Sequence, residues 1–368
     1  ARTAAQAGAD VILAEEDSVM GGRLLAESCR IDGQAGAAWA EAVLDELRGM
    51  PNVRLMVRTA VTGAYDDGTF GALERVGLHC APAPHLPREC FWRIVARQAV
   101  LAAGALERPM GFPDNDRPGI MLASAVRSYL HRYGVVPGQR VAVVANNDGA
   151  RATARDLMAA GVKVVGILGA RPDASAVEDC PVYLNVQITG TAGRLGLSSI
   201  SFRHAGGTAT LEVDTLAMSG GWNPTVHLTC HMNGRPLWRE DIAAFVPAPG
   251  AVPRLTAAGA CNGAFSTAAC LREGRDAALA ALAALGRAAE VALPVADDTA
   301  YAITPFWETP GVEGRQWLDF ANDVTTKDVK LSAQENFRSV EHMKRYTTQG
   351  MAPDQGKNSN VAALAVLA

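Results

Sequence analysis

The sequence predicts an α/β protein that contains two Rossmann-like dinucleotide-binding domains. Residues 1–57 and residues 138–168 each alternate short apolar strand patterns with amphipathic helix patterns, which is typical of such domains. The composition agrees, because 49% of the 368 residues are hydrophobic, Ala and Gly are abundant and aromatic residues are few. A chain of this length can bury two or three cores.

Charge and composition exclude several classes of function. The net charge is −4 and no Lys/Arg-rich block occurs, so we expect no nucleic acid partner. No apolar run reaches membrane-spanning length and no signal peptide is visible, so we expect a cytoplasmic protein without membrane contact. The seven cysteines contain no C-x-x-C pair, which excludes a zinc pair or a thioredoxin-like redox pair. We expect them to be reduced and buried.

The first dinucleotide-binding pattern begins at the first residue. Residues 1–10 have the composition of the back half of a helix that ends at a Gly, and residues 11–14 predict a short buried strand. Glu15 and Glu16 follow at the carboxyl end of that strand, where a ribose would lie. Two carboxylates there suit a ribose diol and repel a 2′-phosphate, although a solvated acidic turn would have the same composition. The E-x₅-G-G pattern, typical of flavoproteins with two dinucleotide-binding domains, favours a nucleotide.

The same domain continues through a helix and two strands. The spacing of apolar residues predicts a helix over 36–49 and strands over 53–57 and 59–66. Val61, in the second strand, lies where the adenine packs in such folds. A valine of the hydrophobic core explains this residue equally well.

A crossover between two nucleotide-binding domains follows. Residues 98–105 predict a strand that runs into a Gly turn, and Glu107-Arg108-Pro109 come next. This pattern, A-x-G-x-x-x-R-P over residues 102–109, resembles the crossover of FAD/NAD(P)-dependent disulfide-reductase relatives. Gly104 lacks a side chain and would let the backbone approach a pyrophosphate. The redox-active C-x₄-C of those reductases is absent here.

The second Rossmann-like unit has a degenerate phosphate loop. Strands over 138–144 and 161–168 flank a helix over 149–160. The loop between them has Ala145 and Asn147 where the G-x-G-x-x-G pattern has its first two glycines. The carboxylate of Asp148 would lie beside a pyrophosphate, and the following strand ends without an acid. We therefore expect no NAD(P)H at this second site.

A later segment returns to the first nucleotide site. Residues 255–267 predict a strand, a Gly turn and the start of a helix that runs to about residue 287. The helix N-terminus would face the phosphates, with Ser266 or Thr267 as a donor. Ala260 and Cys261 replace the G-D whose Asp holds ribitol in disulfide-reductase relatives, which favours NAD over FAD. Before this segment, strands are predicted over 182–189, 199–203, 208–213 and 216–228.

Two motifs near the C-terminus resemble the [2Fe–2S] domain of the bacterioferritin-associated-ferredoxin (BFD) type. That pattern is C-x-C-x-D-V-T followed by G-M-x-x-C-Q-G-x-x-C, and this chain reads DFANDVT at 319–325 and GMAPDQGKNSN at 350–360. An iron–sulfur cluster needs thiolate ligands. We therefore expect a helical segment without a cluster or another metal, with a structural or interface role. The four cysteine positions hold Asp319, Ala321, Asp354 and Ser359.

The chain as a whole is very similar to the α subunit of heterotetrameric sarcosine oxidases. The specific part is the C-terminal region, namely residues 322–325, the run from Glu335 to Met351, and residues 354–357. The turn at 219–224 and the crossover at 102–109 agree with the family, while the Rossmann parts are generic.

The resemblance implies an oxidoreductase subunit that acts on the CH–NH group of a small amine. It implies an NAD in the first Rossmann site of α that does not turn over, and a β subunit with FAD and a covalent FMN at the α/β interface. It also implies γ and δ subunits, and an aminomethyltransferase-like domain of α where tetrahydrofolate accepts the one-carbon unit. The products would be glycine, 5,10-methylenetetrahydrofolate and H₂O₂. The NAD-binding positions carried over by motif are Glu15, Glu16, Gly22, Arg23, Val61, Ala260, Phe265 and Thr267.

We expect four parts. They are a first dinucleotide-binding domain at 1–108, an inserted second domain at 109–232, a return to the first domain at 233–300, and a degenerate [2Fe–2S]-type domain at 301–368. Both ends lead us to expect a piece of a longer protein that has the first glycine loop and the folate domain. No triad, carboxylate pair or metal set makes this piece catalytic by itself.

Two alternatives stay open. One is the α subunit of an opine, proline or other amine dehydrogenase, or of a cyanide-forming complex. The other is a non-catalytic scaffold with an empty nucleotide site.

Overall fold

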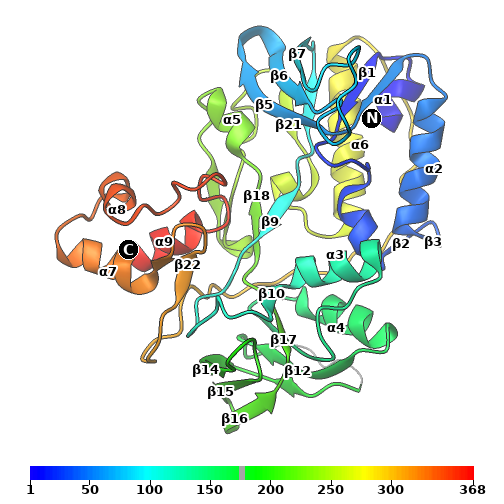
Figure 1. Cartoon of the computed structure of the whole chain (residues 1–368). Coiled ribbons are helices and arrows are strands. Elements are labelled where there is room, and N and C mark those ends of the chain that lie inside the picture. The colour runs from blue at the N-terminus through cyan, green and yellow to red at the C-terminus, as the bar shows by residue number, and fades with distance from the viewer. Residues whose placement is uncertain (174–178) are drawn as a thin grey trace. The chain divides into compact units, whose positions relative to one another are not determined.

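The computed structural model describes residues 1–173 and 179–368, which form two compact units (Figure 1). The first unit consists of residues 1–105, 224–239 and 245–299. The second consists of residues 106–223, 240–244 and 300–368. The four-part division expected from the sequence stays a prediction. In the described ranges, no helix combines the length and the apolar character that crossing a membrane requires.

The first unit contains two parallel strand pairs and a separate antiparallel sheet. β1 pairs in parallel with β4, β8 pairs in parallel with β21, and β5, β6 and β7 form the antiparallel sheet. Its elements are α1 (Arg2–Gln6), β1 (Val11–Ala14), β2 (Arg30–Ile31), β3 (Gln34–Ala35), α2 (Gly36–Arg48), β4 (Val53–Met56), β5 (Thr59–Tyr65), β6 (Thr69–Glu74), β7 (Cys90–Val95), β8 (Ala99–Leu101), α5 (His227–His231), β19 (Leu237–Arg239), β21 (Leu255–Ala257) and α6 (Thr267–Ala284).

Strand β1 corrects one expectation. The sequence predicts a buried strand, but Ile12 in β1 is 49% exposed, and Val100 in β8 is 42% exposed. Within the described residues, β1 has only β4 as a neighbour and β8 has only β21. A strand with a neighbour on one side has fewer side chains packed beside its own, so the apolar pattern alone overstated the burial.

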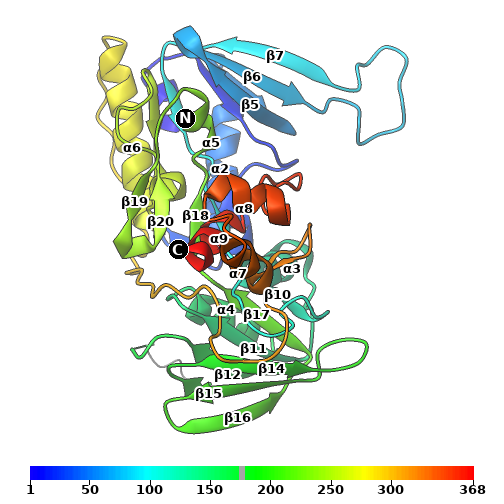
Figure 2. The ribbon, with the colours of Figure 1, turned by 90° about the vertical axis from the view of Figure 1, so that its left-hand side faces the viewer.

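The second unit is centred on a five-stranded parallel sheet in the order β10-β17-β11-β12-β13. Side chains of β11 alternate between its two faces. Val141 and Val143 pack with helices α3 and α4, whereas Ala142 and Val144 pack toward the antiparallel sheet β14-β15-β16. Figure 2 shows the ribbon of these elements. These elements are β10 (Ile120–Leu122), α3 (Ala123–Tyr133), β11 (Arg140–Ala145), α4 (Ala150–Ala159), β12 (Lys163–Gly169), β13 (Val182–Tyr183), β14 (Gln187–Ala192), β15 (Ser199–His204), β16 (Gly207–Glu212) and β17 (Thr215–Ser219).

Two strands predicted as continuous are interrupted. Residues 182–189 divide into β13 and β14, because Asn185 between them adopts a left-handed backbone with φ 55°. Residues 216–228 divide at the Gly220-Gly221 turn into β17 and β18. Where the chain passes between the units it forms β9 (Ala105–Glu107), β18 (Trp222–Pro224) and β20 (Ala244–Val246).

The C-terminal part of the second unit is small and mainly helical, as the sequence predicts. Its own core contains Leu318, Val329 and Met343, with Ala362 and Ala363 of α9. A capping box between Thr325 and Asp328 begins α7, which explains the abrupt start of that helix. The elements are β22 (Trp317–Asp319), β23 (Val324–Thr325), α7 (Thr326–Gln334), α8 (Val340–Thr347) and α9 (Asn360–Leu367).

Arg108 lies inside the second unit with only 1% of its surface exposed. Its Nε donates to the Gly220 carbonyl oxygen at 3.1 Å, and its Nη1 donates to Asn223 Oδ1 at 3.2 Å and to the Ala243 carbonyl oxygen at 2.6 Å. The guanidinium also lies over the ring of Trp307, 5.2 Å from its centre. These contacts join segments that are far apart in the sequence.

Burying the Arg108 guanidinium costs free energy, and its hydrogen-bond acceptors offset only part of that cost. Burial lowers the pKa of Arg108 to about 10, so the group stays charged at neutral pH. The unfolded chain holds this proton more tightly, so the contribution of Arg108 to stability improves only as pH rises above about 10.

We expect Arg108→Lys to destabilise the second unit by about 2–3 kcal/mol, because one ammonium cannot reach three acceptors placed for a planar fork. Thermal unfolding followed by circular dichroism measures this as a fall in Tm of roughly 4–10 °C. Arg140→Lys, an exposed arginine of the same unit whose partner Glu212 is also exposed, is the control and should stay within about 0.5 kcal/mol. Equal Tm values for the two variants would contradict this role of Arg108.

Candidate functional site

Glu15 and Glu16 lie directly after β1, as the sequence predicts. The Glu15 backbone is held on both sides, because its amide donates to Met56 at 2.8 Å and its carbonyl accepts from Thr59 at 2.8 Å. The Glu15 carboxylate accepts the amide of Asp17 at 3.0 Å and so closes the acidic turn. Glu16 is exposed. At the end of the strand, the turn therefore presents the hydrogen-bonded carboxylate of Glu15 and the exposed side chain of Glu16.

Open space lies beside two glycines of the same unit. Gly22 has φ 55° and Gly104 has φ 71°, and a Cβ built on either residue would meet no atom within 4 Å. A dinucleotide needs this kind of close backbone approach. The binding of NAD beside these glycines and the acidic turn stays a prediction.

Arg23 is exposed and forms an ion pair with Glu27, one turn along the short helix of Gly22–Ala26. Its charge also acts on Cys270 at the start of α6. Burial raises the pKa of the Cys270 thiol, and the Arg23 charge opposes that rise. The fold therefore brings the charge of Arg23 within electrostatic range of the first turn of α6, far along the sequence.

Val61 belongs to a packed apolar cluster. It lies against Leu101, Leu228 and Cys261, with Leu255 and Ala257 beside them. This position agrees with the interpretation of Val61 as a core residue, and it brings the strand of Val61 beside the closing segment, residues 255–267. A contact of Val61 with an adenine stays a prediction.

The closing segment begins helix α6 in the predicted way. Ser266 is its N-cap, and the Ser266 hydroxyl accepts the amide of Ala269 at 3.2 Å. Ala260, Phe265 and Thr267 are all half-buried around this helix start. Ser266 also donates to Asp298 at 2.5 Å, so its hydroxyl is already engaged.

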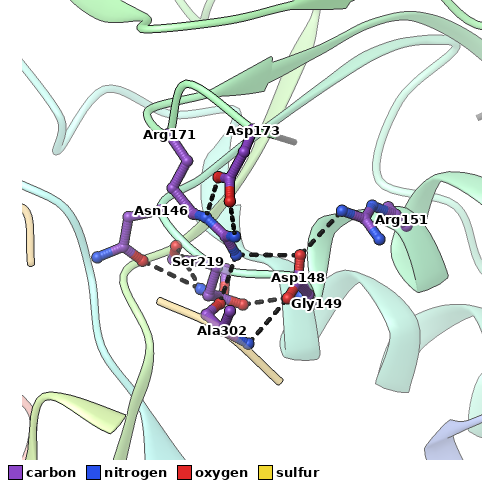
Figure 3. Close-up of polar contacts among 9 residues, drawn as sticks. Asn146, Asp148, Gly149, Arg151, Arg171, Asp173, Ser219 and Ala302 are labelled. Atoms are coloured by element: carbon purple, nitrogen blue, oxygen red, sulfur yellow. Dashed lines mark hydrogen bonds and ion pairs between the residues drawn. The ribbon is translucent and has the colours of Figure 1, made fainter. Parts of the chain in front are cut away.

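The loop of the second Rossmann unit is filled by its own side chains (Figure 3). Asn147 is 6% exposed, and its Nδ2 donates to the carbonyl and hydroxyl oxygens of Ser219, both at 3.0 Å. Its Oδ1 accepts the amide of Gly149 at 2.9 Å, at the start of α4. Asn146 is fully buried and donates to the Gly220 carbonyl oxygen at 3.3 Å. The backbone amide of Gly149, which would face a phosphate at the start of α4, thus already donates to Asn147.

Asp148 does not merely repel phosphate, as the sequence led us to expect; it is paired within the protein. Its Oδ1 accepts from Arg151 at 2.9 Å and lies 3.1 Å from Arg171 Nη1. Its Oδ2 accepts the amide of Ala302 at 2.8 Å. Hydrogen bonding to Asp173 is the main cause that raises the pKa of Arg171. Arg151 is three residues away, but sequence reasoning missed Arg171 and Ala302 because only the fold brings them to Asp148.

Asp319, at one of the four cysteine positions of the BFD-type pattern, accepts hydrogen bonds from backbone amides. Asp319 is 3% exposed and accepts the amides of Ala321 at 3.0 Å, Asn322 at 3.1 Å and Gly350 at 2.9 Å. One carboxylate therefore joins the two motifs of the BFD-type frame. Within the described part of the chain, no three His, Cys, Asp or Glu side chains are grouped so that they could hold a metal ion.

The other former cysteine positions vary in burial. Ser359 is buried and accepts from Gln349 Nε2 at 2.6 Å, and Asp354 accepts the amide of Gly356 at 3.2 Å. Ala321 is exposed. The seven cysteines form no disulfide within the described residues, and only Cys261 is buried, whereas Cys80 and Cys230 are exposed. The expectation of seven buried thiols was therefore wrong, because Cys occurs here in loops and at the end of a short helix.

Comparison with known families agrees with these features. Residues 313–368 match the family model described as the sarcosine oxidase A3 domain. Over its whole length, the chain is 46% identical to the sarcosine oxidase subunit alpha of Rhizobium meliloti (strain 1021) and covers 38% of that protein. It is 40% identical to the corresponding subunit of Corynebacterium sp. (strain P-1), covering 100% of this chain and 40% of that protein. The chain thus spans about 40% of the length of these relatives.

A solved structure shows the same fold at low sequence identity. The L-proline dehydrogenase of P. horikoshii superposes with a TM-score of 0.74 and 18% identity, over 100% of this chain and 70% of that one. This likeness confirms the predicted fold class, because the dinucleotide-binding architecture is shared. It carries no argument about the reaction.

Cys261 should resist alkylation in the folded protein. Burial raises its pKa to about 11, so at pH 8 about one molecule in a thousand has the thiolate. Treatment with iodoacetamide followed by mass spectrometry should label Cys80 and Cys230, and label Cys261 only after unfolding. Rapid labelling of Cys261 in native protein would show that the closing segment opens readily.

Replacement of Asp319 by Asn should destabilise the C-terminal part by about 1–3 kcal/mol, because an amide can accept at one atom only and leaves a backbone donor unpaired. The matched control is Asp323→Asn. Asp323 is exposed with φ 54°, a backbone that Asn tolerates. Hydrogen exchange at the Gly350 amide should rise in the first variant alone. An unchanged Gly350 amide would contradict the assigned role of Asp319.

Proposed function

We propose that this chain, which belongs to the sarcosine oxidase alpha subunit family, is the NAD-holding part of the α subunit of a multi-subunit sarcosine oxidase. The observation that carries the proposal is the 46% identity over the full chain to a sarcosine oxidase alpha subunit. Among the described residues, no three His, Cys, Asp or Glu side chains are grouped so that they could hold a metal ion. In this proposal the chain is an oxidoreductase component, and its role is to hold a cofactor.

The reaction of the whole complex is part of this proposal. Sarcosine, O₂ and tetrahydrofolate would give glycine, 5,10-methylenetetrahydrofolate and H₂O₂. The amine would be oxidised on a β subunit that holds FAD, with an FMN at its interface with α. Tetrahydrofolate would be bound by an aminomethyltransferase-like domain of the α subunit, and γ and δ subunits would complete a cytoplasmic heterotetramer.

NAD is proposed at the first Rossmann site, where it would be a bound ligand and not a reactant. Glu15 and Glu16 would accept the ribose hydroxyls, and open space beside Gly22 supports a nucleotide there. Arg23 would pair with phosphate, at the cost of its contact with Glu27. Val61 would line the adenine. The closing contacts would come from Ala260, Phe265 and Thr267.

FAD is a weaker candidate for the same site. The Ala260-Cys261 sequence provides no carboxylate for ribitol, and Cys261 donates to the Leu101 carbonyl oxygen at 3.5 Å. A buried thiol engaged with the backbone does not replace the Asp that holds ribitol in disulfide-reductase relatives.

An amine dehydrogenase subunit is the second candidate function. The fold shared with L-proline dehydrogenase is compatible with this function, but a shared architecture does not favour it over the oxidase. The two candidates differ in their electron acceptor. The purified complex with its natural partners should consume O₂ with sarcosine as substrate and release H₂O₂. Turnover of proline or an opine without O₂ consumption would establish the dehydrogenase instead.

The nucleotide proposal is tested on the intact α subunit. Glu15→Gln/Glu16→Gln should weaken NAD binding about tenfold and reduce discrimination against NADP, because two carboxylates no longer accept from the diol or repel a 2′-phosphate. Isothermal titration after removal of endogenous nucleotide measures both affinities. The exposed Glu89→Gln variant of the same unit is the control.

A further measurement separates NAD from a scaffold without nucleotide. Folded α subunit that passes through gel filtration should retain NAD, which mass spectrometry identifies after acid release. An empty site in well-folded protein, or NAD affinity unchanged in the double variant, would overturn the assignment of this site.

A further inference from the structure

The second Rossmann unit keeps the framework of a nucleotide site. Strand β11, a tight loop and helix α4 stand in the order that normally presents backbone amides to a pyrophosphate. The next strand, β12, ends close to Arg171, near the position where such folds recognise the ribose or its phosphate. In this chain each of these parts is in contact with another part of the same unit.

Residues 302–304 lie along the phosphate loop as an added strand. Asn147 and Ile303 form an antiparallel bridge. The amide of Asp148 donates to the Ala302 carbonyl oxygen at 3.2 Å, and the amide of Thr304 donates to the Asn146 carbonyl oxygen at 2.9 Å. The backbone of the loop is therefore paired with the chain itself, at the edge where a dinucleotide would be bound.

The charges of the site are balanced by Asp148. Its side chain is 14% exposed and contacts Arg151, Arg171 and the Ala302 amide, as Figure 3 shows. Two guanidinium groups and a backbone amide near a helix N-terminus are the donors that usually hold a phosphate. Here one carboxylate of the loop takes all three donors.

Arg171 also holds the added strand directly. Its Nη1 donates to the Ala302 carbonyl oxygen at 2.8 Å, while its Nε and Nη2 each donate to Asp173 at 2.9 Å. Only 9% of the Arg171 side chain is exposed. The residue best placed to recognise a nucleotide phosphate is thus fully used by the loop, the added strand and its own neighbour.

From these contacts we propose that the second Rossmann unit is an internally occupied nucleotide site. Its ligand is the chain's own segment at residues 302–304, and Asp148 takes the place of the dinucleotide phosphate. The site has become an anchor that holds the segment leading into the C-terminal BFD-type frame. This inference does not rest on NAD in the first site, so either proposal can fail alone.

The test is hydrogen exchange of the full chain, resolved to single amides. Asp148→Ala removes the carboxylate but leaves the acceptor of the Thr304 amide, the Asn146 carbonyl, in place. If Asp148 anchors the strand, the Thr304 amide should exchange about tenfold faster or more, because release of the strand exposes it. Equal protection of Thr304 in variant and parent would overturn the proposal.

Asp173→Asn is the matched control. It changes the same charge and removes a partner of Arg171, but Asp173 does not contact the added strand and its side chain is 66% exposed. Its Thr304 amide should exchange as in the parent protein. A comparable acceleration in both variants would mean that general loss of charge around Arg171, and not the Asp148 anchor, sets the protection.

A measurement on the unaltered protein covers the case in which Asp148→Ala fails to fold. Exchange of Ala302 and Thr304 is compared with and without millimolar NADH or NADPH. If residues 302–304 occupy the site, the exchange rates of both amides should be the same with and without the nucleotide. Faster exchange on addition of either nucleotide would show that the segment is displaced from a working site, and would overturn the proposal.

Discussion

The burial of Arg108 is the constraint on which the arrangement of the second unit depends. Burying a guanidinium is costly unless its donors find acceptors. Here Nε and Nη1 find them in the turn at 220–223 and at Ala243, whereas Nη2 is buried without a hydrogen-bond partner. Asn223 extends the chain of contacts, because its Nδ2 donates to the Lys357 carbonyl oxygen at 2.8 Å. The crossover, the turn and the C-terminal frame are therefore held by one connected set of hydrogen bonds.

Two carboxylates of the second unit each accept hydrogen bonds from several donors at once. Asp148 satisfies the donors of a phosphate loop, and Asp319 satisfies three amides of a cluster-type frame. In each case the backbone geometry survives because its buried donors keep an acceptor. A loop can thus keep its backbone geometry when one of its own side chains accepts from donors that would otherwise lack a partner.

Local patterns were good predictors of elements and poor predictors of burial. The helix at Gly36–Arg48 and the strand–helix–strand of the second unit follow from apolar spacing and from Gly punctuation. The predicted burial of Ile12 was wrong, because the burial of a strand depends on its neighbours in the sheet and not on its own sequence. Asn185 broke a predicted strand, because a single left-handed residue interrupts a pattern that still looks continuous in hydrophobicity.

The sequence by itself determined the fold class, the acidic turn at Glu15 and Glu16, the degenerate loop and the loss of all four cluster cysteines. These features depend on residue identity within short windows, where sequence carries the whole physical argument. Only the tertiary structure decided how the substituted groups are satisfied. Asp148 meets Ala302 across 154 positions, and Asp319 meets Gly350 across 31. Hydrogen bonds of this kind require that distant segments be placed within about 3 Å of each other, and no local pattern encodes that placement.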